Sequence, residues 1–253
     1  GELWGASAVI RLTEIATQTD EIELGTAILN VFSRTPALLA MTAATLDDVS
    51  GGRFRLGVGT STRKAIEDLH GLEWDDPNPV RRAHETIELT KAFLGDGGRV
   101  DHDGDIFEVA DFPALDSDVP VYHAALGKAN RRVVARLCDG WIPHNVPFSL
   151  LADHHEYIRE HAEKAGRSDR IDVAPYVPAA VDEEPETARD VIRGHVAYYV
   201  GNGKGYERAV AERFPDQADT VATAWRSGDR ETATEAVTDA MVRELGVAGP
   251  PER

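Results

Sequence analysis

Two short stretches of the sequence place glycine, basic residues and hydroxyl or amide side chains directly after a predicted strand. They are GTSTRK at 59–64 and LGKANRR at 126–132. In the second, Gly127 precedes a predicted helix, whose first-turn N–H groups and positive dipole end favour an anion. Together the two stretches predict a site for a phosphate or carboxylate group. The alternative is that their basic side chains pair with nearby acidic residues and serve only the fold.

Histidines supply the other candidates for chemistry. His123 and His144 are predicted at the ends of adjacent strands, where each could contact a substrate or act as a general acid or base. The alternative is that they are polar residues of the sheet edge without a catalytic role. His154 and His155 point to different sides of a predicted helix, so no metal site is expected there. Cys138, the one cysteine, is predicted to be buried and unreactive.

An alternation of strands and helices must position these groups. The strand segments are apolar on both faces, which favours a parallel sheet covered by helices. Because no GxGxxG pattern follows the first strand, we expect a β/α barrel, with chemistry at the carboxyl ends of the strands. The predicted strands are 22–29, 53–59, 119–125, 140–145 and 171–181; the predicted helices are 6–19, 36–50, 79–95, 128–138, 149–166, 185–200 and about 230–245.

Two segments interrupt this alternation within a domain expected to span residues 1–253. Residues 98–118 predict a β-hairpin with an Asp-Gly turn. Their DHDGD stretch lacks the glycine and glutamate spacing of a calcium loop, so we expect a solvated hairpin. A helical insertion is expected at about 200–228, and its GNGKG stretch (201–205) predicts a mobile surface turn.

The composition limits the partners. The formal net charge is −17, which disfavours nucleic acid. Only five of the 27 basic residues are lysines, and an acidic, lysine-poor surface favours a salt-adapted protein from a haloarchaeon-like source over an ordinary acidic protein. No apolar run predicts a membrane span, and the first residues lack a signal peptide. We expect a cytoplasmic homodimer or higher homo-oligomer that acts on a small molecule.

Two longer segments carry a family resemblance. LGTAILNVFSRTPALLAMTAATLDDVSGGRFRLGVG (24–59) and PVYHAALGKANRRVVARLCDGWI (120–142) closely resemble the luciferase-like flavin and deazaflavin oxidoreductases. The turn after GTA…N looks most like the branch dependent on coenzyme F420, which includes the methylene-tetrahydromethanopterin reductases. The resemblance implies a (β/α)8 TIM barrel that binds coenzyme F420, or alternatively FMN, at its carboxyl-terminal mouth.

The resemblance also assigns roles to residues of this chain. It implies a cis peptide bond between Ala27 and Ile28 behind the cofactor ring. Gly57 and Gly59 would let the backbone approach that ring. The cofactor-binding residues that it implies are Ala27, Ile28, Asn30, Gly59, Thr60 and Ala125 around the ring and Gly127, Lys128, Ala129 and Asn130 around the phosphate.

The chain has fewer strands than the family's barrel. We predict five core strands, with the first βαβ unit and the last αβ unit missing. The acid and base residues would then lie outside this chain, apart from His123 and His144. The function implied is hydride transfer between reduced F420 and a small organic substrate. The alternatives are an FMN-dependent monooxygenase and a non-catalytic relative or fragment.

Overall fold

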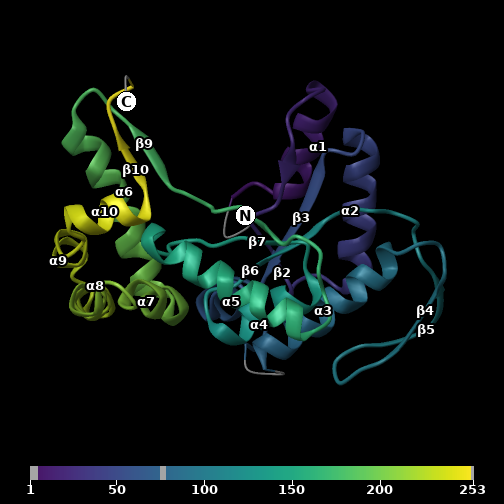
Figure 1. Ribbon diagram of the computed structural model, residues 1–253. Helices are drawn as coiled ribbons and strands as arrows, with labels where there is room; N and C mark the ends of the chain where they lie inside the picture. Colours follow the sequence, from purple (N-terminus) through teal and green to yellow (C-terminus); the bar gives the residue numbers. More distant parts are fainter. Residues whose placement is uncertain (1–4, 75–77, 252–253) are drawn as a thin grey trace. The chain divides into compact units, whose positions relative to one another are not determined.

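The computed structural model describes residues 5–74 and 78–251, which divide into two compact units (Figure 1). Unit 1 comprises Gly1–Ile142 and Ile158–Val173, and unit 2 comprises Pro143–Tyr157 and Ala174–Arg253. The expectation of a single domain over 1–253 stays a prediction. Among the described residues, no helix has the length and apolar character needed to cross a bilayer.

Unit 1 is built on a parallel sheet with the order β1–β3–β6–β7–β8, in which β2 also pairs with β3. Because β1 and β2 are two halves of the predicted strand 22–29, the six strands occupy five positions. Within the described residues β1 and β8 end the sheet without closing it, which confirms the incomplete α/β barrel. The strands are β1 (Leu24–Gly25), β2 (Leu29–Asn30), β3 (Phe54–Gly59), β6 (Val121–Ala124), β7 (Gly140–Trp141) and β8 (Asp172–Val173).

Helices α1 (Ala8–Gln18), α2 (Pro36–Ser50), α3 (Pro79–Leu94) and α4 (Lys128–Leu137) belong to the same unit. The start of α2 follows from its sequence: the Thr35 hydroxyl accepts the N–H of Leu38, and Pro36 fills the first helical position. It ends at Gly51, whose φ of 68° is left-handed. Buried apolar side chains of α2 and of the strands form the core, and their removal from water stabilises the unit.

The insertion in unit 1 is an antiparallel pair, β4 (Arg99–Asp103) and β5 (Glu108–Pro113), which Figure 1 shows extending away from the sheet. Glu85 of α3 anchors its turn: the carboxylate accepts the N–H groups of Ile106 at 3.0 Å and Phe107 at 2.8 Å. Burial alone would raise the pKa of Glu85, but these hydrogen bonds and one from His102 lower it. The turn is therefore held by an ionised protein carboxylate.

Unit 2 is mainly helical around one apolar core that includes Val196, Val221 and Met241. A short parallel pair, β9 (Ala179–Val181) and β10 (Val247–Gly249), packs with α6. The helices are α6 (Pro185–Asn202), α7 (Lys204–Ala211), α8 (Pro215–Ser227), α9 (Arg230–Glu235) and α10 (Asp239–Leu245), while α5 (Leu151–Lys164) has residues in both units.

Three sequence predictions are wrong in detail. The strand predicted at 171–181 is divided into β8 and β9, because Pro175 and Pro178 have no N–H for a ladder. The helix predicted at 230–245 is two helices, since the Thr238 side chain caps a new start by accepting the N–H of Met241. The predicted strand 140–145 is regular only in β7 and stops before Pro143.

The GNGKG stretch is not a mobile surface turn. It contains the end of α6 and the start of α7, and Gly201 and Gly203 are buried. A Cβ on Gly201 would lie 2.0 Å from the Trp225 ring, so the glycine exists to let α8 approach α6. The stretch is a helix–helix junction of unit 2.

Candidate functional site

The carboxyl ends of the neighbouring strands β2, β3 and β6 lie at one edge of the sheet, as expected for parallel strands. In the parallel register, Asn30 of β2 pairs with Gly59 of β3, and Gly59 pairs with Ala124 of β6. Thr60 follows Gly59 directly and is half-buried. The two loops singled out in the sequence, and the loop after Asn30, therefore leave one edge of the sheet side by side.

The backbone behind this edge has the predicted form. The peptide bond between Ala27 and Ile28 is cis. The Ile28 side chain lies against Gly59: a Cβ at that glycine would be 3.1 Å from Ile28 Cγ1 and 3.3 Å from Ala124 Cβ. Ile28, Gly59 and Ala124 thus form a close apolar surface that suits contact with a flat ring.

Position 57 is a glycine for a different reason. A Cβ there would lie 1.8 Å from the carbonyl oxygen of Thr26 and 2.7 Å from Ile142 Cδ1. The Thr26 hydroxyl also donates to the Gly57 carbonyl at 2.8 Å and accepts its N–H at 2.9 Å. The prediction that Gly57 opens space for a ring is wrong, because protein atoms fill that space.

Asn30 is buried and its carboxamide is largely engaged. Its Oδ1 accepts the N–H groups of Phe32 at 3.1 Å and Ser33 at 2.7 Å, and its Nδ2 lies 3.3 Å from Nε2 of His70. These contacts shape the loop after β2. His70 follows a single π-helical turn, η1 (Ala65–Leu69), and no sequence pattern indicated its contact with Asn30.

The basic residues of the GTSTRK loop pair with nearby acidic residues, which is the alternative to an anion site. Arg63 pairs with Glu67 at 2.9 Å, and Lys64 pairs with Asp68 at 2.8 Å, each along η1. Such exposed pairs contribute little to stability. The loop itself turns sharply at Ser61, whose φ of 63° is left-handed. The basic side chains of this loop therefore have local acidic partners.

The start of α4 does fit an anion. Gly127 is its N-cap, with φ −87° and ψ 157°, and no side chain caps the first turn. A Cβ on Gly127 would meet nothing within 4 Å, so the space before these N–H groups is open. Lys128 is exposed and Ala129 half-buried, whereas Arg131 is buried. The chemistry of this turn, with open N–H donors and an adjacent lysine, suits a phosphate.

Two further predicted residues lie just inside this turn. Ala125 is fully buried, and its carbonyl accepts the Trp141 indole N–H at 2.8 Å. The Asn130 side chain turns inward, with Oδ1 3.3 Å from Nε2 of His123. Both residues therefore hold the α4 start to β6 and β7.

His123 is completely buried on β6. Its Nδ1 lies 3.1 Å from the Val58 carbonyl and its Nε2 contacts Asn130, and burial lowers its pKa despite these contacts. A neutral ring that donates from Nδ1 to Val58 and accepts at Nε2 from the Asn130 amide, turned so that its NH₂ faces the ring, satisfies this geometry. His123 joins β3, β6 and α4.

His144 lies in unit 2, among aromatic rings. Its Nε2 is 3.0 Å from Nε2 of His195 and its Nδ1 is 3.4 Å from the Tyr206 hydroxyl. The rings of Tyr176 and Tyr199 lie edge-on to it, with centroids 4.8 and 4.5 Å away. Burial, with a smaller contribution from His195, lowers the pKa of His144 to about 3, so the ring is neutral at pH 7.

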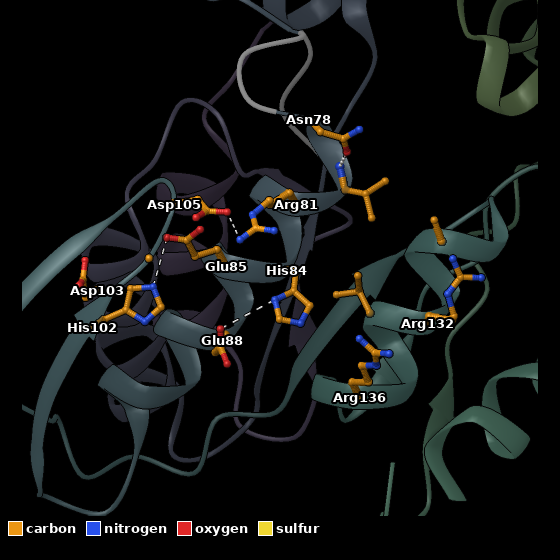
Figure 2. A pocket seen from close by; sticks show the side chains of 14 residues that line it. Asn78, Arg81, His84, Glu85, Glu88, His102, Asp103, Asp105, Arg132 and Arg136 are labelled. Carbon is orange, nitrogen blue, oxygen red and sulfur yellow. Dashed lines mark hydrogen bonds and ion pairs between the residues drawn. The ribbon is translucent and has the colours of Figure 1, made fainter. Parts of the chain in front are cut away.

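A cavity of unit 1 lies between α3, α4 and the hairpin turn (Figure 2). Its volume is about 590 Å³, and the sequence did not indicate it. Figure 2 shows Arg132 and Arg136 on the α4 side and Glu85, Asp103 and Asp105 on the side of the hairpin, with His84 between them. Ala129, from the first turn of α4, also lines it. Among the described residues there is no cluster of three or more His, Cys, Asp or Glu that could hold a metal.

Comparison with known proteins agrees with this geometry. The chain is 30% identical to the 5,10-methylenetetrahydromethanopterin reductase of Archaeoglobus fulgidus over 95% of this chain and 74% of that protein. It is 33% identical to the F420-dependent glucose-6-phosphate dehydrogenase of Nocardia farcinica over 72% of this chain and 56% of that protein.

The structures agree as well. The coenzyme F420-dependent tetrahydromethanopterin reductase of Methanopyrus kandleri superposes with a TM-score of 0.80 at 27% identity, covering 98% of this chain and 76% of that one. The family model described as luciferase-like monooxygenase matches residues 1–253. With its parallel half-barrel and cis Ala27–Ile28 bond, this chain belongs to the luciferase-like monooxygenase family.

Proposed function

We propose that the protein is an oxidoreductase that transfers a hydride between coenzyme F420 and a small organic substrate. The observation that carries this proposal is the open, uncapped start of α4 at Gly127, next to the Ile28–Gly59–Ala124 surface on the same sheet edge. A phosphate site and a flat apolar surface are what a ring cofactor with a phosphate requires. The relatives named for F420 support this cofactor over FMN.

The residues of this chain would hold the cofactor rather than react with it. The N–H groups at the start of α4 and the Lys128 ammonium would bind the phosphate. Ile28, Gly59 and Thr60 would contact the ring, and His123 with Asn130 would fix α4 in place. Reduced F420 would supply the hydride, and the protein would orient the ring and exclude water.

His123 and His144 are the candidates in this chain for a general acid or base. Both ring nitrogens of His123 have protein partners, which supports a positioning role for this residue. His144, with the neighbouring His195 and Tyr206, is the stronger candidate for proton transfer, because the three side chains form a chain of hydrogen-bonding groups.

An assay of hydride transfer tests the function. In one direction, purified protein would be mixed anaerobically with reduced F420 and 5,10-methylenetetrahydromethanopterin. In the opposite direction, it would be mixed with oxidised F420 and glucose 6-phosphate. These are the substrates that the relatives' names suggest. Turnover seen in the deazaflavin absorbance supports the proposal. Turnover only with reduced FMN and oxygen would favour the monooxygenase alternative, and binding without turnover would favour a non-catalytic relative.

Gly127→Val is expected to weaken F420 binding at least tenfold, or about 1.4 kcal/mol, because the added side chain occupies the space of the phosphate. The fold should change little, since a Cβ at this position meets no atom within 4 Å. Fluorescence titration of F420 and circular dichroism measure the two effects on one sample. Gly127→Ser is the second variant: serine is a good N-cap, so it keeps the helix while its hydroxyl competes for the same N–H groups. Unchanged affinity in both variants would place the phosphate elsewhere.

We propose adaptation to high salt, as in a haloarchaeon-like source, from the net charge of −17. At 1 M salt the screening length is about 3 Å, so repulsion among the surface carboxylates is largely removed. The midpoint of thermal unfolding should therefore rise between dilute buffer and molar KCl. An equal or lower midpoint in KCl would contradict the adaptation.

We also propose a cytoplasmic homo-oligomer. The exposed face of α2 carries Leu38, Met41 and Val49, which are 45%, 50% and 40% exposed, and such an apolar stripe supports contact with a second copy. Light scattering on wild type and Met41→Asp tests this; a monomeric wild type would refute it.

The single buried Cys138, whose pKa burial raises to about 12, is compatible with a reducing compartment, and cell fractionation would test the location.

A further inference from the structure

We propose that His70 recognises the substrate, by donating a hydrogen bond from its ring Nδ1 to an oxygen or nitrogen acceptor of the substrate. This inference rests on the proposed function and adds to it a residue for the substrate, besides those that would hold the cofactor. The substrate that it predicts is a small organic molecule that carries such an acceptor next to an apolar part.

The contact with Asn30 determines which nitrogen of His70 can donate. Asn30 Oδ1 accepts two backbone N–H groups, from Phe32 and Ser33, so the other end of the carboxamide is the NH₂ group. That NH₂ group lies 3.3 Å from Nε2 of His70, and a proton on Nε2 would set two donors against each other. In the neutral ring, Nε2 therefore accepts and the proton is on Nδ1. Among the residues that the structure describes, none accepts a hydrogen bond from this Nδ1.

His70 stands at the edge of the sheet that carries the proposed ring surface. Its partner Asn30 ends β2 and is paired in register with Gly59. The loop after Gly59 leads into η1, and the His70 N–H donates to the Ala65 carbonyl at 3.2 Å, five residues back, as in a π-helical turn. Such single π-helical turns are frequent at functional sites. The imidazole is therefore one side chain away from the strand ends at which Ile28 and Gly59 would contact the ring.

The segment around His70 is exposed but fixed in place. His70 itself is exposed, and the flanking Leu69 and Leu72 are 50% and 39% exposed, so apolar side chains stand next to the imidazole. Four residues after His70, the Trp74 ring stacks on Phe32, with ring centroids 5.3 Å apart and planes 13° from parallel. An exposed imidazole among apolar side chains, anchored to the loop after β2 by two contacts, suits a partly apolar substrate with a hydrogen-bond acceptor.

Two variants separate substrate recognition from the contact with Asn30. In His70→Gln the longer amide reaches the position of Nε2 and can still accept from the Asn30 NH₂ group, but the Nδ1–H donor is lost. In His70→Asn the shorter amide places its NH₂ group near the position of Nδ1, while the contact with Asn30 is lost. The substrate for the test is whichever of 5,10-methylenetetrahydromethanopterin and glucose 6-phosphate the wild type turns over. Its kcat/KM should fall about tenfold in His70→Gln and stay within about threefold of wild type in His70→Asn.

The affinity for F420 should change by less than about twofold in both variants, because the lost contact is with the substrate. The control is His161→Gln, which changes a half-buried histidine elsewhere in unit 1 and should keep the wild-type kcat/KM. Full kcat/KM in His70→Gln, with a loss only in His70→Asn, would show a purely structural role and overturn the inference. An F420 affinity that falls as much as kcat/KM would assign the contact to the cofactor and overturn it as well.

Nitrogen NMR of the imidazole gives a readout that does not depend on turnover. In protein with isotope-labelled histidine, in mildly alkaline buffer and with His70→Gln for assignment, His70 should show the tautomer with its proton on Nδ1. Adding the substrate with the form of F420 that does not react with it should shift the Nδ1 resonance. A proton on Nε2, or an Nδ1 resonance that the substrate leaves unchanged, would overturn the inference and leave the proposed function intact. Failure of the wild type to bind F420 and to turn over either substrate would overturn the proposed function, and this inference with it.

Discussion

Gly57→Ala is expected to lower the free energy of unfolding by about 3 kcal/mol, the upper range for overpacking a well-filled core. The new methyl group would be placed 1.8 Å from the Thr26 carbonyl oxygen, which is backbone and cannot rotate away. It would also press on Ile142 and disturb the two hydrogen bonds between Thr26 and Gly57. Chemical unfolding in molar KCl measures the effect.

Gly127→Ala is the matched control, because the same methyl group there meets open space. The loss of a good N-cap residue should cost it about 1 kcal/mol or less. Comparable losses at the two positions would show that the strand around Thr26 yields easily. In that case the close contact would not be the reason for glycine at position 57.

Acid is expected to destabilise unit 2 through His144. The folded ring resists protonation, with a pKa of about 3, whereas an unfolded histidine binds a proton below about pH 6.5. The unfolded state then holds more protons, so stability is complete above about pH 6.5 and is lost as the pH falls toward 3. The slope is about 1.4 kcal/mol per pH unit for this one group.

The variant His144→Gln should lose this part of the slope, which unfolding between pH 7 and 5 would show. The groups that face His144 are His195, whose pKa burial also lowers, Tyr199 and Tyr206, whose pKa values burial raises, and Tyr176. His195 therefore retains a slope of the same sign in the variant. His155→Gln on α5 is the control. An unchanged slope in His144→Gln would mean that the ring gains its proton without loss of the fold.

The parts of the site that the sequence predicted are those fixed by regular geometry. Parallel strands bring their carboxyl ends to one edge, so the loops at Asn30, Gly59 and Ala124 could be placed together before the structure was known. The open start of α4 followed from Gly127 standing before a helix. The family resemblance supplied the cis bond at Ala27–Ile28.

The parts that the sequence did not predict depend on contacts between distant residues. Gly57 and Gly59 are two residues apart in the same strand, yet only the three-dimensional position of Thr26 shows that protein atoms fill the space beside Gly57. The contact of His144 with Tyr206 joins residues 62 positions apart. The cavity likewise arises where Glu85 anchors the hairpin turn to α3, a contact across 21 and 22 residues that no local pattern indicates.

The most direct test of the central claim is a parallel titration of the purified protein with F420 and with FMN in molar KCl. The claim predicts saturable binding of F420 that is at least tenfold tighter than that of FMN, a difference of about 1.4 kcal/mol. It also predicts that Gly127→Val loses most of the F420 affinity while the fold is retained. Tighter binding of FMN, or binding of neither cofactor by a folded protein, would contradict it.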